Sequence, residues 1–234
     1  MPEPKAAPNL KAAIVPVTPF QQNCTLLWDA TSRRGAVIDP GGDAEAILAA
    51  VRQAGMTVET ILLTHGHLDH AGGAMALQRM LAAAGQVAPI VGPDARDKFL
   101  LDGIGAQARQ YGIAGLENCT PDRWLSEGEQ VSIGGLAFDV LHCPGHTPGH
   151  LVFANQGIGL AIVGDVLFRG SVGRTDLPYG DHAALLASIA TRLLPLGDDV
   201  AFLCGHGPGS TIGMERRGNP FIAELQGTSA RPGD

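Results

Sequence analysis

Thr64-His65-Gly66-His67-Leu68-Asp69-His70 directly follows the apolar run Thr60-Ile61-Leu62-Leu63, which predicts a buried strand. Three imidazoles and one carboxylate therefore stand within six residues at the end of that strand. Alternate side chains of an extended backbone share a face, so His65 and His67 can hold one cation together. Asp69 and His70 follow after the chain turns, where they can reach a second cation. A lone histidine here would more often be a core residue, but four metal-capable groups in this register predict a metal site.

Three later loops supply further candidate ligands in the same context. They are His146 after the apolar segment 136–141, Asp165 after 160–163 and His206 after 200–203. Each lies just beyond a predicted strand and beside glycines that let the backbone approach closely. Loops that meet at one edge of a sheet assemble sites from distant residues, so we expect these three groups to join the first four.

Seven such groups are too many for one cation and suit two, since a catalytic zinc ion takes three or four protein ligands and keeps a position for water. The first ion is assigned His65, His67 and His146, the second Asp69, His70 and His206, with Asp165 bridging both. Two ions about 3.5–4 Å apart can share a hydroxide, because coordination lowers the pKa of bound water toward ~7. The pattern predicts hydrolysis, with Asp69 and Asp165 as catalytic carboxylates. Imidazole and carboxylate ligands without thiolate suit zinc first, and also iron or manganese.

The order of these motifs resembles the metallo-β-lactamase fold superfamily and, within it, short glyoxalase-II-like hydrolases of the hydroxyacylglutathione hydrolase type. The resemblance covers approximately residues 10 to 225 and is also carried by the segments 16–24, 39–45, 141–150 and 164–176. It implies an α/β fold, an αββα sandwich of two mixed β-sheets flanked by helices. It also implies two divalent metal ions per chain and hydrolysis of a glutathione thioester such as S-lactoylglutathione, giving a hydroxy acid and glutathione.

Residues that contact the substrate are harder to predict from the sequence than the metal ligands. Arg174 occupies the loop where the family places a basic glutathione contact, and a surface or structural cation is the alternative interpretation. Longer glyoxalase II enzymes carry a C-terminal helical extension and a tyrosine after the last histidine motif, whereas here His206 is followed by Gly207-Pro208-Gly209-Ser210. A shorter, more open cleft predicts weaker substrate binding or a broader range of thioesters. Arg216 and Arg217 are further cationic candidates, with ordinary helix-surface charge as the alternative.

Other functions fit parts of the same pattern. An iron-dependent persulfide dioxygenase resembles this family and shares the histidine motif and a run like Gly173-Arg174-Thr175-Asp176, but it uses one iron and consumes oxygen. A broad-specificity thioester or lactone hydrolase of the same fold is a second alternative. A zinc β-lactamase of the commonest type would have cysteine in place of Asp165. Relatives that process nucleic acid need a basic or extended arm, and a binding protein without activity would lack ligands, whereas all seven are present.

The composition agrees with a compact soluble enzyme, and the resemblance implies a small-molecule thioester as its partner. The 234 residues carry a net charge of −7. This charge argues against a basic surface that binds the phosphates of a nucleic acid, and hence against nucleic acid as a partner. No apolar run approaches ~18 residues and no charged-then-apolar leader opens the chain, so we expect neither a membrane span nor a secretion signal. Four cysteines lack C-x-x-C spacing, which favours reduced thiols and a cytoplasmic protein. The sequence is compatible with a monomer or a homodimer.

Periodicity predicts one metallo-hydrolase domain over residues 10–226, with a disordered arm at 1–9 and a disordered tail at 227–234. Strands are expected at 12–17, 24–28, 36–38, 60–63, 130–133, 136–141, 151–154, 160–163 and 200–203. Helices are expected at 43–54, 72–84, 94–110, with a break near Gly103 and Gly105, and 181–194. Asp43 is expected to cap the first helix. Asp39 and His150 are candidates to support ligand histidines, with turn or structural roles as alternatives.

Overall fold

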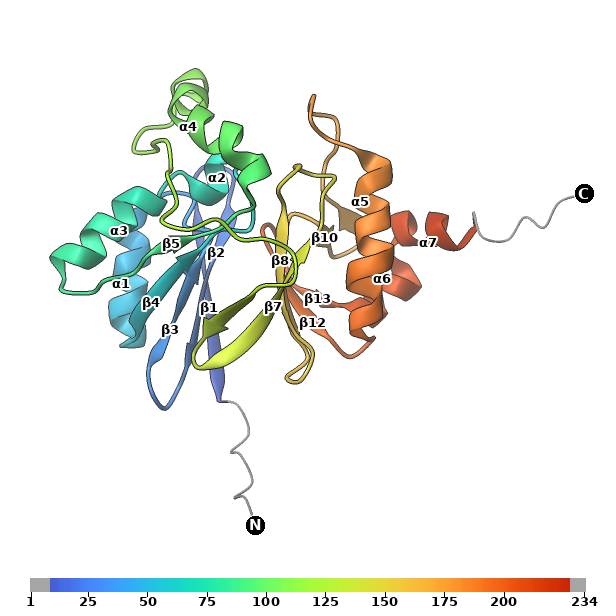
Figure 1. The fold of residues 1–234 in the computed structure, drawn as a ribbon, viewed down its shortest axis with the longest axis horizontal. Helices are drawn as coiled ribbons and strands as arrows, with labels where there is room; N and C mark the ends of the chain where they lie inside the picture. The colour runs from blue at the N-terminus through green and yellow to red at the C-terminus, as the bar shows by residue number, and fades with distance from the viewer. Residues whose placement is uncertain (1–8, 228–234) are drawn as a thin grey trace, which may run out of the picture.

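The computed structural model describes residues 9–227 and shows two β-sheets that pack face to face, with helices on both outer sides (Figure 1). This is the αββα arrangement of two mixed sheets that the sequence predicted. Helices α1 (Ala44–Ala54) and α3 (Ala74–Ala83) lie outside the N-terminal sheet, and α5 (His182–Ser188) and α6 (Ile212–Gly218) lie outside the C-terminal sheet. The expected arm and tail fall almost entirely outside the described residues, which begin at 9 and end at 227.

The N-terminal sheet has the strand order β1-β2-β3-β4-β5. Its strands are β1 (Leu10–Val17), β2 (Gln22–Asp29), β3 (Arg34–Ile38), β4 (Thr57–Leu62) and β5 (Ile90–Val91). The first three pair antiparallel, whereas β3, β4 and β5 pair parallel. Parallel pairs need a crossover, which α1 provides between β3 and β4 and α3 provides between β4 and β5. The carboxyl ends of β3 and β4 therefore emerge at the same edge of the sheet.

The C-terminal sheet has the strand order β13-β12-β9-β8-β7-β6. Its strands are β6 (Gln130–Ile133), β7 (Leu136–His142), β8 (Leu151–Asn155), β9 (Leu160–Gly164), β12 (Ala201–Cys204) and β13 (Ser210–Thr211). Neighbours pair antiparallel except β9 and β12, which run parallel because a crossover containing α5 joins them. A hairpin of β10 (Leu167–Phe168) and β11 (Ser171–Val172) follows β9.

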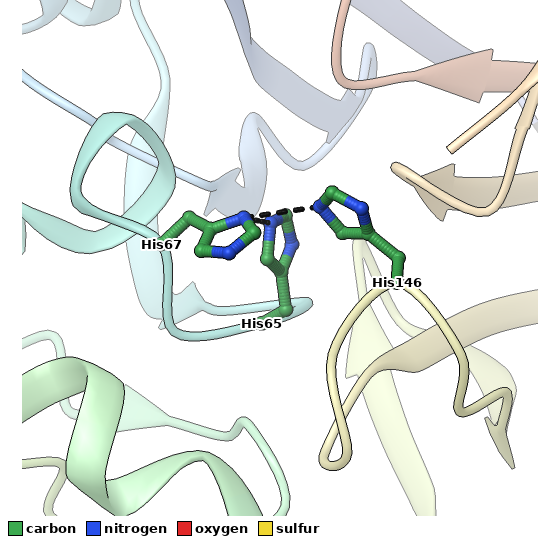
Figure 2. A group of neighbouring side chains, drawn as sticks. All are labelled: His65, His67 and His146. Atoms are coloured by element: carbon green, nitrogen blue, oxygen red, sulfur yellow. Dashed lines mark hydrogen bonds between the residues drawn. The ribbon is translucent and has the colours of Figure 1, made fainter. Parts of the chain in front are cut away.

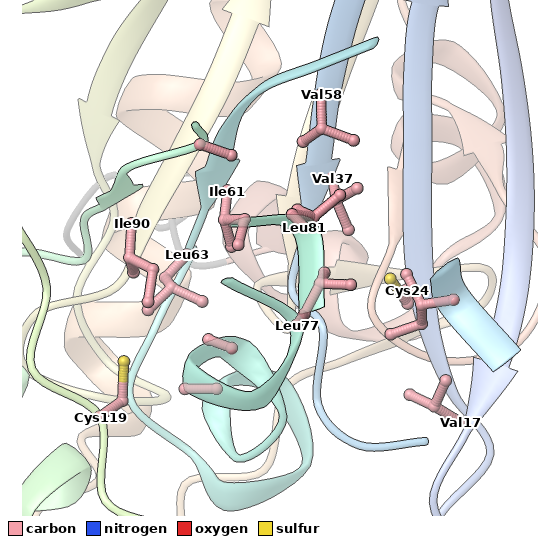
Figure 3. Close-up of a cluster of buried hydrophobic side chains, with 14 of the residues drawn as sticks. Val17, Cys24, Val37, Val58, Ile61, Leu63, Leu77, Leu81, Ile90 and Cys119 are labelled. Atoms are coloured by element: carbon pink, nitrogen blue, oxygen red, sulfur yellow. The ribbon is translucent and has the colours of Figure 1, made fainter. Parts of the chain in front are cut away.

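The space between the two sheets is filled by side chains from both. Leu27 and Leu62 of the N-terminal sheet belong to one buried cluster with Phe138 and Phe153 of the C-terminal sheet. The opposite face of the N-terminal sheet packs under α1 and α3 in a second cluster (Figure 3). Leu26 belongs to this second cluster although it adjoins Leu27, because successive side chains of a strand point to opposite faces. Burial on both faces explains why Ala36, Val37 and Ile38 of β3 are apolar in succession rather than alternating with polar residues.

Asp43 precedes α1 as expected but does not cap the helix with its side chain. Its carboxylate instead accepts the backbone N–H of Thr18 at 2.7 Å, which ties the helix start to the turn between β1 and β2. The residues Ile47, Leu48 and Val51 form the buried face of α1, as their spacing predicted.

The helix expected over 72–84 is confirmed as α3, which begins two residues later, at Ala74. The short helix α2 (Leu68–Ala71), which begins inside the histidine motif and is separated from α3 by Gly72 and Gly73, was not predicted. Two other helix predictions are corrected. The segment expected to break at Gly103 and Gly105 forms α4 (Lys98–Tyr111) without interruption, since its apolar residues bury one continuous face. The helix expected over 181–194 stays α-helical only to Ser188 and continues in wider and then tighter turns to Leu196.

Several short elements were not predicted. The strands β5, β10, β11 and β13 have two residues each, too few to show a period of two. The C-terminal helices α6 and α7 (Pro220–Gly227) were also missed. Within the described part of the chain, no helix combines the length and apolar character that crossing a membrane requires.

Candidate metal centre

Four strand ends deliver candidate ligands to one edge of the sandwich. In the N-terminal sheet, β3 is followed by Asp39, and β4 is followed by Leu63 and the histidine motif. In the C-terminal sheet, β9 is followed at once by Asp165, and β12 by Gly205 and His206. Within each sheet these two strands are parallel neighbours, so the loops after them leave in the same direction. Residues far apart in the sequence therefore reach one cleft.

His65, His67 and His146 form the first group, and Figure 2 shows their rings pointing toward one another. His67 Nδ1 lies 3.0 Å from both His65 Nε2 and His146 Nε2. The first two histidines come from the loop after β4, and His146 comes from the loop between β7 and β8. Both halves of the chain thus contribute to the group, and its members are those that the sequence assigned to one ion.

Asp69, His70 and His206 form the second group, whose candidate ligand atoms all lie within 4.8 Å of one another. Asp69 Oδ2 lies 3.3 Å from His206 Nε2 and 4.0 Å from His70 Nε2. These three residues are also the set that the sequence assigned together. The second group differs from the first in containing a carboxylate of its own.

Asp165 lies between the two groups. Its Oδ2 is 3.6 Å from both His146 Nε2 and His206 Nε2, and its Oδ1 is 3.4 Å from His70 Nε2. One carboxylate therefore reaches nitrogens of both groups, which is the placement that a ligand shared by two ions requires.

The outer nitrogen of three of these rings is tied to an oxygen. His146 Nδ1 donates to the carbonyl oxygen of Arg174 at 2.8 Å, and His67 Nε2 lies 2.8 Å from the hydroxyl of Tyr179. His70 Nδ1 lies 3.0 Å from Asp39 Oδ2. When the outer nitrogen carries the proton, the inner nitrogen presents its lone pair to the cleft, as a metal-binding imidazole must.

Asp39 orients two rings at once. Its Oδ1 accepts the N–H of Thr64 at 2.7 Å, and its Oδ2 accepts the Thr64 hydroxyl at 2.6 Å. Because that hydroxyl donates to Asp39, its oxygen is left to accept from His65 Nδ1, which lies 3.0 Å away. Asp39 therefore fixes His70 directly and His65 through Thr64, and the hydrogen bond expected between Asp39 and a motif histidine is present. These contacts hold ligand-type atoms of Asp39, His65 and His70 within 4.8 Å of one another.

Two buried atoms in the middle of the cluster, His70 Nε2 and Asp165 Oδ1, have no hydrogen-bond partner among the described residues. A buried polar atom without a partner costs about 1–3 kcal/mol, so such atoms call for a bound species. An imidazole nitrogen and a carboxylate oxygen suit a cation of the zinc, iron or manganese type, and none of the seven groups is a thiolate. The cluster therefore fits divalent metal ions.

Burial lowers the proton affinity of the first group. Desolvation, reinforced by the neighbouring histidines, holds the pKa of His65 well below its usual value and lowers the pKa of His67 to about 3. Desolvation also lowers the pKa of His146, although Asp165 opposes the shift. These rings are neutral at physiological pH and their lone pairs are free to bind a cation.

The second group behaves in the opposite way. Desolvation again acts against the charged imidazole, but the carboxylates of Asp165 and Asp69 hold the pKa of His70 well above its usual value. Desolvation is likewise overcome at His206, whose pKa is raised by the hydrogen bond to Asp69 and by Asp165. The same attraction lowers the pKa of both carboxyl groups despite their burial. The second group thus contains one carboxylate and adjoins the shared carboxylate of Asp165, and these two anions attract positive charge.

His150 packs behind the cluster and is fully buried. Its ring stacks on His65 with a centroid separation of 4.6 Å, and its Nε2 accepts the backbone N–H of Asp165 at 3.0 Å. His150 therefore fixes the backbone of the shared carboxylate. Gly205 leaves room for that carboxylate, because a Cβ at this position would lie 2.1 Å from Asp165 Oδ1.

Asp97 joins the two loops that carry the first group. Its Oδ2 accepts the N–H of Gly66 at 2.9 Å and the hydroxyl of Thr147 at 2.7 Å, and its Oδ1 accepts the N–H of Gly149 at 2.6 Å. Gly66 separates the first two histidines of the group, and Thr147 directly follows the third. One carboxylate thus sets the spacing between the loops, and burial raises its pKa to about 6.

Five members of the cluster line a cleft with a volume of about 660 Å³, namely His67, Asp69, His146, Asp165 and His206. Arg174 lines this cleft too, but its guanidinium is engaged by Asp176, with Nε–Oδ1 and Nη2–Oδ2 distances of 2.8 and 2.7 Å. Arg216 and Arg217 instead form ion pairs with Asp198 and are not among the residues that line the cleft.

Three supporting residues escaped the sequence analysis. Thr64 begins the quoted motif, so its position was an available signal. Asp97 fell in a segment interpreted only as helix, and its three hydrogen bonds depend on how two loops meet. Tyr179 stands between Pro178 and Gly180 in a loop without periodicity, and only the folded chain brings it to His67.

The fold and the ligand cluster together define a metal-dependent hydrolase. The model of the Metallo-beta-lactamase superfamily matches residues 17–206, and the chain belongs to this superfamily.

Individual relatives resemble nearly the whole chain. Hydroxyacylglutathione hydrolase GloC of Haemophilus influenzae is 46% identical over 210 residues, which are 89% of this chain and 96% of that protein. The crystal structure of TTHA1623 in a di-iron-bound form is 40% identical with a TM-score of 0.78, covering 89% of this chain and 99% of that one. The crystal structure of BLEG-1 B3 metallo-beta-lactamase is 35% identical with a TM-score of 0.81, covering 91% of this chain and 99% of that one.

Proposed function

We propose that this protein hydrolyses glutathione thioesters of the S-lactoylglutathione type, releasing a hydroxy acid and glutathione, with two divalent metal ions. The observation that carries the proposal is the convergence of five imidazoles and two carboxylates in one cluster, in two groups that adjoin Asp165. The similarity to the hydroxyacylglutathione hydrolase of Haemophilus influenzae supports the substrate. Zinc is the first choice of metal, and the di-iron form of TTHA1623 makes iron the main alternative.

The seven groups divide the work of holding the ions. His65, His67 and His146 would hold one ion, and Asp69, His70 and His206 the other, with Asp165 shared. When bound, the ions would acidify the attacking water and act as Lewis acids toward the thioester carbonyl.

The chain's own side chains orient the reaction. Asp69 is a ligand candidate that also lines the cleft, where its carboxylate can orient the attacking water by a hydrogen bond. The departing thiolate is a weak base, since the pKa of a thiol is about 8.5, so it can leave without a side chain that donates a proton to it. This agrees with the cleft, where the hydroxyl of Tyr179 is a weak acid because burial raises its pKa to about 12.

The substitution His67→Ala tests the proposal. It removes the nitrogen that lies closest to two other members of the first group, so metal content and thioester turnover should fall together, the latter at least about 1,000-fold. His182→Ala is the matched control, because this histidine is exposed and does not line the cleft. Full turnover of S-lactoylglutathione by a metal-depleted preparation would contradict the proposal.

Hydrolysis of a β-lactam is the second candidate, and its support is the similarity to the BLEG-1 B3 metallo-beta-lactamase structure. The same metal-loaded protein should be assayed with a β-lactam and, for oxygen consumption, with glutathione persulfide. A thioesterase hydrolyses S-lactoylglutathione far faster than the β-lactam and consumes no oxygen with the persulfide. Faster β-lactam cleavage, or oxygen uptake, would replace the proposal with the corresponding activity.

A further inference from the structure

Aromatic rings stand beside the ligand cluster in the cleft. Phe20 lies in the turn between β1 and β2, and Tyr111 is the last residue of α4. Their rings meet edge to face with centroids 6.0 Å apart. Phe168 of β10 has its ring centroid 6.3 Å from that of His206. All three rings line the cleft that members of the ligand cluster also line, together with Tyr179, whose hydroxyl lies at His67.

Phe20 and Tyr111 are 42% and 61% exposed. A single exposed apolar side chain is ordinary, but two rings from distant parts of the chain that pack on each other over a cleft form a defined surface. The turn that carries Phe20 is fixed in place, because Thr18 N–H donates to Asp43 Oδ2 at 2.7 Å and Phe20 N–H donates to Thr18 Oγ1 at 3.2 Å. A turn held by hydrogen bonds therefore positions the Phe20 ring at the cleft.

Cationic groups are scarce in the same cleft. Apart from histidines, Arg174 is the only basic side chain among the described residues that line it, and Asp176 already engages its guanidinium. Gln107 and Gln110 of α4 also line the cleft and are uncharged. A glutathionyl group carries two carboxylates and an ammonium group, and a carboxylate pressed against aromatic rings without a partner is strongly disfavoured. The charged end of a glutathione thioester therefore suits the solvated side of the cleft, and the uncharged acyl end suits the rings.

We infer that Phe20, Tyr111 and Phe168 form an acyl-binding surface that selects thioesters with a large apolar or aromatic acyl group over the short lactoyl group. The inference rests on the proposed thioesterase function and names the acyl class that this function serves. Contact between a phenyl group and these rings removes apolar area from water, and aromatic pairs gain further from edge-to-face geometry. A methyl group in the same position buries little apolar area and makes no aromatic contact.

Two glutathione thioesters test the inference directly. S-lactoylglutathione and S-mandeloylglutathione share the thiol and the α-hydroxyl group and differ by a methyl against a phenyl group. For the metal-loaded protein, kcat/KM on each is divided by the rate of its uncatalysed hydrolysis at the same pH, which removes the intrinsic difference in reactivity. The corrected mandeloyl-to-lactoyl ratio should be about ten or more. A ratio of one or less overturns the inference.

Substitutions then assign the preference to the rings. Phe20→Ala and Tyr111→Ala should each lower the corrected ratio about five- to tenfold, whereas Phe20→Leu, which keeps most of the apolar area, should retain most of it. Met214→Ala is the control, because this side chain is 46% exposed and lies outside the cleft. An unchanged ratio in both alanine variants overturns the assignment.

The two possible failures are distinguishable. An active enzyme that prefers the lactoyl thioester contradicts the acyl preference alone. A metal-loaded protein that hydrolyses neither thioester contradicts the proposed function, and the inference with it.

Discussion

The two groups of the candidate metal centre are built from different side chains around one shared carboxylate. The first group is three imidazoles, and desolvation lowers the pKa of every one of them. The second group adds the carboxylate of Asp69, and there the pKa values of His70 and His206 are raised against the effect of burial. Desolvation opposes the charged form of every ring, yet the pKa shifts have opposite directions, because His70 and His206 also form hydrogen bonds with carboxylates.

Because of this difference, we expect protons to compete with metal binding more strongly at the second group than at the first. Neutral rings offer lone pairs to a cation with little competition from protons. A protonated His70 or His206 supplies the positive charge that Asp69 and Asp165 attract, so a proton and a metal ion compete for the second group. We therefore expect the two groups to fill and empty under different conditions.

Removal of one group while the other is kept gives the largest effect. Asp69→Ala takes away the carboxylate that belongs to the second group alone, so the protein should retain about one metal ion per chain. Turnover should fall about 100- to 1,000-fold, since the second ion and the carboxylate that orients water are lost together. Metal content measured with kcat/KM on the same sample checks this. Asp198→Ala, an exposed carboxylate paired with Arg216, is the control, and retention of both metal ions in Asp69→Ala would show that the groups are not separate.

Acidification should empty the second group first. A histidine with a raised pKa gains its proton at a higher pH, so the affinity of the second group for metal should fall by at least about tenfold per pH unit below that pKa. His67 of the first group, with a pKa of about 3, stays neutral at pH 5. Dialysis at decreasing pH followed by elemental analysis should show loss of one ion before the other. Simultaneous release of both would contradict the assignment of protons to the second group.

Smaller effects are expected from the residues that orient the rings. Asp39→Ala should weaken the second site about 10- to 100-fold in metal affinity, because His70 loses its hydrogen-bond acceptor. The first site should be weakened less, because His65 loses only the indirect support that it has through Thr64. Tyr179→Phe removes a single hydroxyl next to His67 and should weaken the first site about tenfold at most. Competition with a chromophoric chelator measures both affinities. Equal weakening of both sites by both variants would mean that these residues act on the fold rather than on separate rings.

The sequence predicted the ligand cluster well because the determining features are local. Four of the candidate ligands lie within one short segment, residues 65–70. The other three, His146, Asp165 and His206, each follow an apolar run that forms a strand. Apolar runs and glycines mark the ends of strands in the sequence itself, so the positions of these residues could be predicted without knowledge of the fold. The αββα layers were implied by the resemblance to the metallo-β-lactamase superfamily, whereas both groupings of ligands came from the order of the residues themselves.

What the sequence could not provide depends on contacts between distant segments. Asp97 looks like any helix-start carboxylate until two loops are placed around it, and Tyr179 gains its role from a single contact with His67. Asp43 has the position of a helix cap, but its carboxylate accepts the backbone N–H of Thr18 and forms no hydrogen bond with the helix. The glycines of α4 suggested a break, yet the helix is continuous because its buried face outweighs their low propensity. Tertiary contacts decided each of these cases.

The central claim is that seven side chains hold two divalent ions, both of which are needed to hydrolyse a thioester. Its most direct test is to titrate metal-free protein with zinc or iron while bound metal and turnover of S-lactoylglutathione are measured on the same samples. The account predicts saturation at two ions per chain, with full activity only as the second ion binds. Full activity at one bound ion, or in protein that binds none, would contradict it.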